Sequence, residues 1–265
     1  MSLDENSTRP LTRAESWRYG ALGLLLFFGI WSAVSLSGLT SAQFLPAPFE
    51  VAGRFFQLLG TPFAGGTLPE HLASSFLRFS YGFLLGALIG VPLGLLMGWY
   101  PTLDDVVTPV FDALRFIAPI AWVPFAALWF GTGVGGPILV IFAGAFPPCL
   151  INAYRGARFV SRPLIEAAQM LGTGNARIIL EVLLPASTAS IIAGLRVSAG
   201  LGWQSLIGAE LIVASTGVGF MMVQAQLNIS TATVMSGMMA IGLVGLALDI
   251  GLRALKADVR RRGLA

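Results

Sequence analysis

The chain has 265 residues, of which 55% are hydrophobic and only 11% charged, with a mean hydropathy of +0.80 and a formal net charge of +3. Soluble domains carry about 25% charged residues, so this composition excludes an ordinary water-soluble protein. The single cysteine, Cys149, excludes an internal disulfide framework.

The apolar runs are long enough to cross a bilayer, which takes about 20 residues of helix. The predicted spans are residues 19–39, 71–99, 107–130, 137–154, 186–213 and 231–252. Before them lies a polar tail over residues 1–18, and after them a basic tail over residues 253–265. The first run lacks a cleavage site and is predicted to be a retained span. The sequence therefore predicts an all-α membrane protein, with a six-helix transmembrane domain over residues 19–252.

Between the spans, two stretches indicate segments that do not cross the membrane. Residues 49–59 have an amphipathic pattern, so we expect a short helix that lies at the interface. Residues 215–230 indicate a re-entrant or interfacial segment with glycine hinges. Proline is expected to interrupt the third span, because it cannot donate a backbone hydrogen bond inside a helix. The prolines concerned are Pro109, Pro119 and Pro124.

The second span carries a glycine at every fourth position. These glycines are Gly82, Gly86, Gly90, Gly94 and Gly98. Four residues turn a helix by about 400°, so the glycines form one slowly drifting stripe. Such a stripe lets a neighbouring helix approach closely. We expect that neighbour to belong to the same subunit, with a subunit interface as the alternative.

The longest polar interruption in the second half, residues 161–185, predicts two short helices joined by a glycine elbow. Ser161 is expected to cap the first helix, and Gly172 to stop it in a left-handed conformation. Asn175 is expected to cap the second helix and Pro185 to end it. The small side chains on this hook would let the backbone of another protein come close.

Basic residues gather in the two tails and around the hook, whereas only Arg54 falls in a loop on the opposite side. Loops rich in Lys and Arg stay in the cytoplasm. Both termini and the hook are therefore predicted to be cytoplasmic. This distribution explains the positive net charge without nucleic-acid binding.

Within the apolar spans, a few polar or aromatic residues are candidates for a translocation path or gate, because charges inside a membrane are costly and mark functional paths. They are Arg78, Arg115, Arg196, Trp203 and Glu210. Residues 196, 203 and 210 are seven apart and share one face of the fifth span. The alternatives are ion pairing within the bundle or snorkelling to headgroups. Asp112, three residues before Arg115, is a possible helical partner.

Little in the chain supports catalysis. The glycine-rich stretch at residues 131–136 is followed by Pro137 rather than by Lys and Ser or Thr, so it is not a P-loop. No group of His, Cys and carboxylate residues has metal-ligand spacing, and the lone His71 is expected to be an interfacial side chain. We expect no cofactor on this chain and an energy source on another polypeptide.

The hook resembles the EAA motif of bacterial ABC importer permeases, EAA-x3-G-x9-I-x-L-P. The matching residues are Glu166, Ala167, Ala168, Gly172, Leu184 and Pro185. Val182 replaces the Ile of the motif, a nearly volume-conserving change. LPAP at residues 45–48 and SSFLRFSYGF at residues 74–83 are similar to the nitrate, sulfonate and taurine branch. The resemblance implies the MetI-like permease fold of type I ABC importers.

It further implies that the hook sits in a cleft of an ATP-binding subunit, which binds the ATP and magnesium. The permease would act as a homodimer in the bacterial inner membrane and receive its solute from an extracytoplasmic binding protein. A small anion such as a sulfonate, taurine or nitrate is expected, with a heterocyclic vitamin precursor as the alternative. A self-contained secondary transporter would leave the hook unexplained, and a membrane-embedded hydrolase lacks a nucleophile and base pair.

Overall fold

The computed structural model describes residues 12–38, 41, 43–131 and 133–261. Apart from one isolated bridge between Phe63 and Gly66, the regular structure of these residues is helical. The elements are α1 (Arg13–Leu36), α2 (Pro48–Leu58), α3 (Leu68–Trp99), α4 (Pro101–Arg115), η2 (Pro119–Trp122), α5 (Val123–Phe130), α6 (Gly135–Arg158), α7 (Arg162–Met170), α8 (Asn175–Ile178), η3 (Ile179–Leu183), α9 (Leu184–Val213), α10 (Val218–Leu227) and α11 (Thr231–Arg261). Five helices are long and apolar enough to cross a membrane, and a bent pair makes a sixth if it counts as one span.

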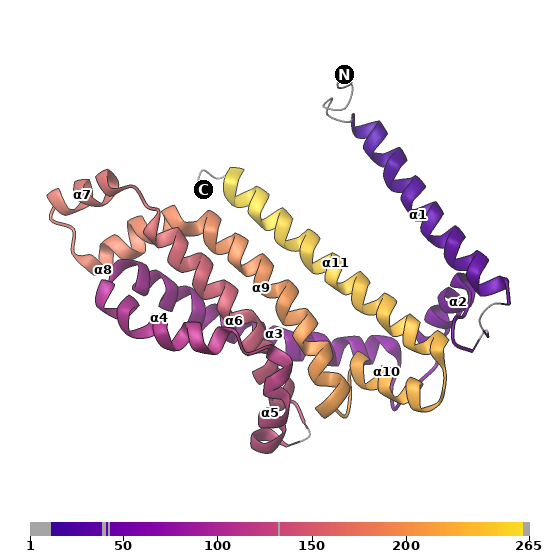
Figure 1. Ribbon diagram of the computed structural model, residues 1–265. Helices are drawn as coiled ribbons and strands as arrows, with labels where there is room; N and C mark the ends of the chain where they lie inside the picture. The colour runs from indigo at the N-terminus through magenta and orange to yellow at the C-terminus, as the bar shows by residue number, and fades with distance from the viewer. Residues whose placement is uncertain (1–11, 39–40, 42, 132, 262–265) are drawn as a thin grey trace, which may run out of the picture.

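The centre of the bundle is α6, which packs along α3 on one side and along α9 on the other (Figure 1). A buried apolar cluster joins the three helices through Phe79, Ile141 and Trp203. Arg78 lies on α3 of this three-helix arrangement, and Arg196 and Glu210 lie on α9.

The glycine stripe of α3 faces α6 of the same chain. A Cβ atom on Gly82 would stand 2.6 Å from the Cβ of Ile141, and one on Gly94 would stand 2.9 Å from the Cβ of Ala153. Real side chains do not approach so closely, so only glycine permits this contact between the two helices. The prediction of packing within the subunit is therefore confirmed.

The third predicted span is two helices rather than one. α4 and the segment Pro119–Phe130 are bent by 89° at a break directly before Pro119. Pro109 lies inside α4 without ending it, and Pro124 stands in the first turn of α5. A proline in a first turn leaves no helical hydrogen bond unmade, so the expectation of three breaks is wrong at Pro109 and at Pro124.

The second helix of the hook does not end at Pro185. Helix runs without interruption from Asn175 to Val213, through α8, η3 and α9. η3 is a π-helical segment directly before Leu184 and Pro185. Its wider turn accommodates the missing N–H and the ring of the proline, which an α-helical interior would not. Pro185 thus marks a junction inside one long helix, which corrects the expected stop.

α1 stands apart from the rest of the bundle and meets it at its C-terminal end (Figure 1). There the indole Nε1 of Trp31 donates to the carbonyl of Pro46 at 3.1 Å, and the hydroxyl of Ser35 donates to the carbonyl of Leu45 at 2.8 Å. The remaining apolar surface of α1 is exposed, as expected of a helix surrounded by lipid.

The terminal helices are longer than the predicted spans. α1 begins at Arg13 because Thr12 and Glu15 form a capping box, so the end of the expected polar tail is helical. At the other end α11 continues to Arg261, well into the expected basic tail. The remainder of the two predicted tails, residues 1–11 and 262–265, lies outside the described residues.

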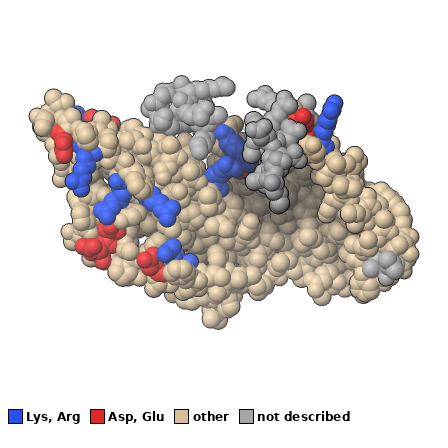
Figure 2. Space-filling view, turned by 45° about the horizontal axis from the view of Figure 1, so that its top comes forward, with Lys and Arg blue, Asp and Glu red and all other residues tan. Residues whose placement is uncertain are grey.

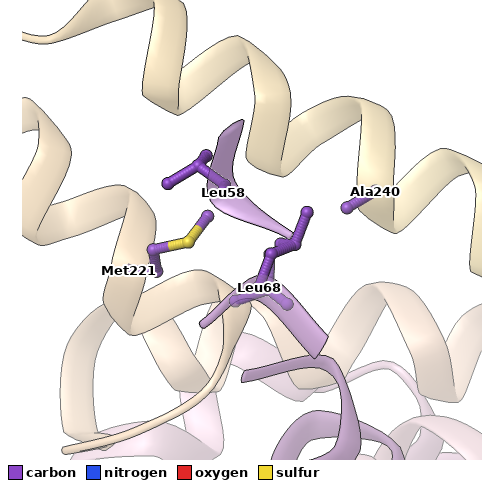
Figure 3. Close-up of a cluster of buried hydrophobic side chains, with 5 residues drawn as sticks. Leu58, Leu68, Met221 and Ala240 are labelled. Atoms are coloured by element: carbon purple, nitrogen blue, oxygen red, sulfur yellow. The ribbon is translucent and has the colours of Figure 1, made fainter. Parts of the chain in front are cut away.

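One end of the bundle is closed by α2 and α10. Figure 3 shows the apolar cluster that holds them, in which Leu58 of α2 and Met221 of α10 meet Leu68 of α3 and Ala240 of α11. All four side chains are nearly or fully buried. The predicted re-entrant segment is therefore the short helix α10, packed on the starts of α3 and α11.

Candidate coupling hook and translocation site

The predicted hook is present as α7, an elbow and α8. The elbow is a Schellman turn: Gly172 N–H donates to the carbonyl of Gln169 at 2.9 Å, and Thr173 N–H donates to the carbonyl of Ala168 at 3.1 Å. Gly172 has a φ of +74°, in the left-handed region that glycine enters without steric cost. The predicted role of Gly172 in the elbow is confirmed.

Two details of the hook differ from the sequence prediction. Ser161 stands at the N-cap position of α7, but its side chain makes no capping hydrogen bond. Gly174, not Asn175, is the N-cap of α8, and Asn175 is already helical. Glycine serves at an N-cap almost as well as Asn does, so the short connection is made by Gly172, Thr173 and Gly174.

The hook is largely exposed. In α7 the structure shows no buried residue, and Glu166, Ala167 and Gly172 are exposed. Met170 and Leu171 at the elbow are 87% and 85% exposed. Leu184 and Pro185 are half-buried where the hook joins α9. On the face shown in Figure 2, charged side chains gather at the end of the molecule that carries α7 and α8.

Arg78 and Glu210, two of the predicted path residues, meet in a buried ion pair. Arg78 Nη1 lies 2.9 Å from Glu210 Oε1, and the two side chains are 5% and 0% exposed. The hydroxyl of Ser75 lies 2.8 Å from each oxygen of the same carboxylate. Arg78 also donates to the carbonyl of Thr216 at 2.6 Å and to its hydroxyl. A buried charge with these partners has its hydrogen-bonding capacity largely satisfied.

The position of His71 differs from the sequence prediction. The side chain is 4% exposed rather than interfacial. The backbone N–H of Gly217 donates to its Nδ1 at 3.3 Å, and its Nε2 lies 2.9 Å from the carbonyl of Phe63. Both contacts form when Nε2 carries the proton and Nδ1 accepts the hydrogen bond. Sequence reasoning missed this role, although His71, Ser75 and Arg78 share one face of α3 at helical spacing.

Arg196 and Trp203 lie on the same face of α9 as Glu210, as predicted, and both contact α11. Arg196 Nε is 2.5 Å from Asp249 Oδ1, in a pair whose side chains are 39% and 30% exposed. Trp203 is buried, and its indole N–H donates to the carbonyl of Ile241 at 3.1 Å. Asp249 was not among the sequence candidates, because its partner lies on another helix.

Arg115 lines a separate cavity of about 620 Å³ between the α4–η2 bend, α6 and α9. Its Nε pairs with Asp112 Oδ1 at 2.7 Å, which confirms the expected pairing within one helix. Arg155, Asn152 and Gln204 also line the cavity, which has two guanidinium groups and no carboxylate among its lining residues. Of the five predicted path residues, only Arg115 lines this cavity. The face of α9 that bears residues 196, 203 and 210 packs on other helices instead.

This architecture and this hook define a class of membrane protein. Residues 90–261 match the family described as the inner membrane component of binding-protein-dependent transport systems, and the chain belongs to that family. It is the permease subunit of an ABC importer and a multi-pass membrane protein. In this family ATP is hydrolysed by a separate ATPase subunit, and a binding protein supplies the solute.

Relatives with described roles cover nearly the whole chain. The taurine transport system permease protein TauC of Escherichia coli is 36% identical over 248 residues, which are 93% of this chain and 90% of TauC. The bicarbonate transport system permease protein CmpB of Synechococcus elongatus is 34% identical over 259 residues, 92% of each chain. Among solved structures, the MetNI methionine ABC transporter in inward-facing conformations has a TM-score of 0.61 at 19% identity, covering 72% of this chain and 94% of that one. This last likeness shows the shared permease fold.

Proposed function

We propose that this chain carries a small anion across the bacterial inner membrane, as one of two identical permease subunits driven by a partner ATPase that binds ATP and magnesium. The observation that supports an anion most directly is the cavity lined by Arg115 and Arg155 without a carboxylate. Guanidinium groups bind oxyanions well because several N–H donors are arranged in one plane. Taurine and bicarbonate, named for the two relatives, both bear an anionic group.

The hook is the proposed contact with the ATPase. Glu166, Ala167, Ala168 and Gly172 form a compact surface of small and acidic side chains at one end of the molecule, and the apolar side chains of Met170 and Leu171 extend from it. Leu184 and Pro185 connect this surface to α9 through the π-helical segment. Movement of the hook would therefore be transmitted directly along a helix of 39 residues.

A homodimer with both tails and the hook in the cytoplasm completes the proposal. The basic residues around the hook and near the C-terminus support this orientation. The cavity next to Arg115 is open in a single subunit, and a second copy would close it into a path between subunits. The ion pairs of Arg78 and Arg196 would then hold the walls of that path.

The test is uptake in proteoliposomes that contain the permease, its ATPase and its binding protein. Uptake of labelled taurine and of labelled bicarbonate is compared between the wild type, Arg115→Gln and Arg54→Gln. Arg54 is the matched control, because the same charge is lost away from the cavity. Its Nε donates to Thr233 at 2.8 Å, its Nη1 donates to Gln57 at 3.4 Å, and its guanidinium lies over the Phe63 ring. We expect Arg115→Gln to lower uptake at least tenfold and Arg54→Gln to leave it within twofold.

Co-purification with the ATPase separates the two parts of the proposal. Glu166→Ala combined with Gly172→Val should abolish association or uncouple ATP hydrolysis from uptake, while Arg115→Gln should leave association intact. Association that survives in the hook variant together with normal uptake would refute the coupling role. Equal uptake of the anions by wild type and Arg115→Gln would refute the anion path.

A further inference from the structure

The N-terminus of α10 is capped by side chains from two other helices. An α-helix leaves its first backbone N–H groups without partners inside the helix. Here three consecutive groups are each bound: Gly217 N–H by His71 Nδ1 at 3.3 Å, Val218 N–H by the Ser75 hydroxyl at 3.0 Å, and Gly219 N–H by Glu210 Oε2 at 3.0 Å. The start of α10 is therefore held by α3 and α9 rather than by its own residues.

Arg78 and Glu210 form hydrogen bonds that connect α3, α9 and the start of α10. Glu210 of α9 receives hydrogen bonds from Ser75 and Arg78 of α3 as well as from α10, and Arg78 also binds Thr216 in the loop before α10. The carboxylate of Glu210 lies at the N-terminus of α10, which is the positive end of the helix dipole. Separating any one of the three segments would leave a buried charge or several buried N–H groups without partners.

The backbone at this point is shaped for contact with the carboxylate. Gly217 has a φ of +111°, and a Cβ atom there would stand 2.5 Å from the carboxyl carbon of Glu210. A Cβ on Gly219 would stand 2.6 Å from the Cβ of Glu210. Any side chain at either glycine would therefore push α10 away from α9.

The junction lies at the end of α9 remote from the hook (Figure 1). The continuous helix from Asn175 to Glu210 is about 50 Å long at 1.5 Å per residue. Next to the junction, Leu68 of α3 and Met221 of α10 meet in the apolar cluster of Figure 3, so the polar and apolar contacts tie the same two segments.

We propose that His71, Ser75, Arg78 and Glu210 are positioning residues that lock α10 onto α3 and α9, so that the three segments move as one rigid body throughout the transport cycle. The outer end of the path then opens elsewhere in the dimer, and α10 is not a gate that swings away from its own subunit. The inference depends on the proposed transport function only in the experiment that measures uptake.

A cysteine cross-link tests whether the lock opens. Cys149, the only cysteine of the chain, is replaced by Ala, and Leu68→Cys and Met221→Cys are introduced next to the lock. The pair is oxidised in the complete complex in proteoliposomes, and uptake is measured before oxidation, after oxidation and after reduction. We expect uptake after cross-linking to stay within twofold of the reduced sample. Loss of uptake that returns on reduction would show that α10 leaves α3 in each cycle and would overturn the proposal.

Amide hydrogen exchange of the permease in lipid tests the lock without relying on transport. Ser75→Ala removes the acceptor of Val218 N–H, and we expect exchange in a peptide covering residues 217–221 to rise at least tenfold. Ser80→Ala is the matched control, because that exposed hydroxyl on the same helix only donates to the carbonyl of Phe76. Unchanged exchange in Ser75→Ala, or an equal rise in Ser80→Ala, would overturn the capping role. A chain without transport activity would still give this result, so failure of the lock and failure of the proposed function remain distinguishable.

Discussion

At the scale of single residues, Gly172 shows how a local conformation sets a functional requirement. Its φ of +74° is accessible to glycine and tolerated by asparagine, whereas a β-branched residue there is strained by about 1–2 kcal/mol. No neighbouring atom lies within 4 Å of a Cβ at this position. Backbone conformation, rather than space, is therefore what favours glycine in the elbow.

Substitutions in the elbow should follow this rule. Gly172→Val is expected to leave membrane insertion intact and to lower uptake more than tenfold, because the Schellman turn that orients α7 is lost. Gly172→Asn should retain most of the uptake. The control is Gly174→Ser, two residues away, where φ is −71°, a Cβ also has open space and serine remains a good N-cap. Uptake in proteoliposomes, normalised to inserted protein, checks the series; equal effects of Val and Asn would contradict the conformational explanation.

Whereas Gly172 acts through local conformation, Arg78 and Glu210 form a contact that the sequence does not reveal, because the two residues lie far apart in the chain. They are 132 residues apart, and each alone indicates only a costly charge in an apolar span. Breaking one partner of a buried pair destabilises a protein by about 3–5 kcal/mol, because the other charge is left unpaired. The ion pair between Arg78 and Glu210 therefore stabilises the fold, independently of any role that the two residues have in transport.

At the scale of elements, the packing of α3 on α6 depends on small residues on both helices. At the end of the glycine stripe, Gly98 faces Ala157 so closely that a Cβ on Gly98 would collide with the Cβ of that alanine. Overpacking of this kind costs about 1–3 kcal/mol. The two positions should therefore be energetically coupled.

Exchange of the two residues tests that coupling. Gly98→Ala is expected to lower the free energy of unfolding by about 1–3 kcal/mol. The second change, Ala157→Gly, should restore part of the loss; because glycine within a helix itself costs about 1 kcal/mol, recovery should be incomplete. Gly23→Ala on α1, where a Cβ has open space, is the control. Thermal unfolding in detergent measures the wild type, the two single variants, the double variant and the Gly23→Ala control. Strictly additive effects of the two changes would argue against the contact.

At the scale of the whole molecule, the arrangement of helices predicts which surfaces face which side of the membrane. α3, α6 and α9 run between one end that carries the hook and another that carries α2 and α10 (Figure 1). Gly60, in the loop between α2 and α3, and Gly174, in the hook, are both exposed, and a Cβ on either has open space. The two positions should therefore be reached from opposite sides.

Single cysteines provide the measurement. In a Cys149→Ala background, Gly60→Cys is expected to react with a membrane-impermeant maleimide in intact cells, and Gly174→Cys only in inverted vesicles. A reversed pattern would invalidate the proposed cytoplasmic position of the hook and, with it, the contact with the ATPase. Labelling of both cysteines after detergent lysis controls for buried thiols.

The sequence by itself determined the features that depend on near neighbours in the chain. Apolar length predicts the spans because a bilayer requires a set length of helix; the elbow at Gly172 and the pairing of Asp112 with Arg115 follow from local backbone geometry. The motif of the hook is equally local, and so it identified the family. The stop expected at Pro185 failed because a π-helical turn accommodates the proline, which no local pattern revealed.

Only the tertiary structure decided which distant residues meet. It showed that the glycine stripe packs against α6 of the same chain and that Arg196 pairs with Asp249. It also showed that His71, Ser75 and Glu210 together cap α10, with Arg78 paired to Glu210. The physical reason is that helical periodicity specifies which face of a helix a residue occupies but not which neighbour covers that face. Buried polar groups must find partners, and those partners are chosen by the packing of whole helices.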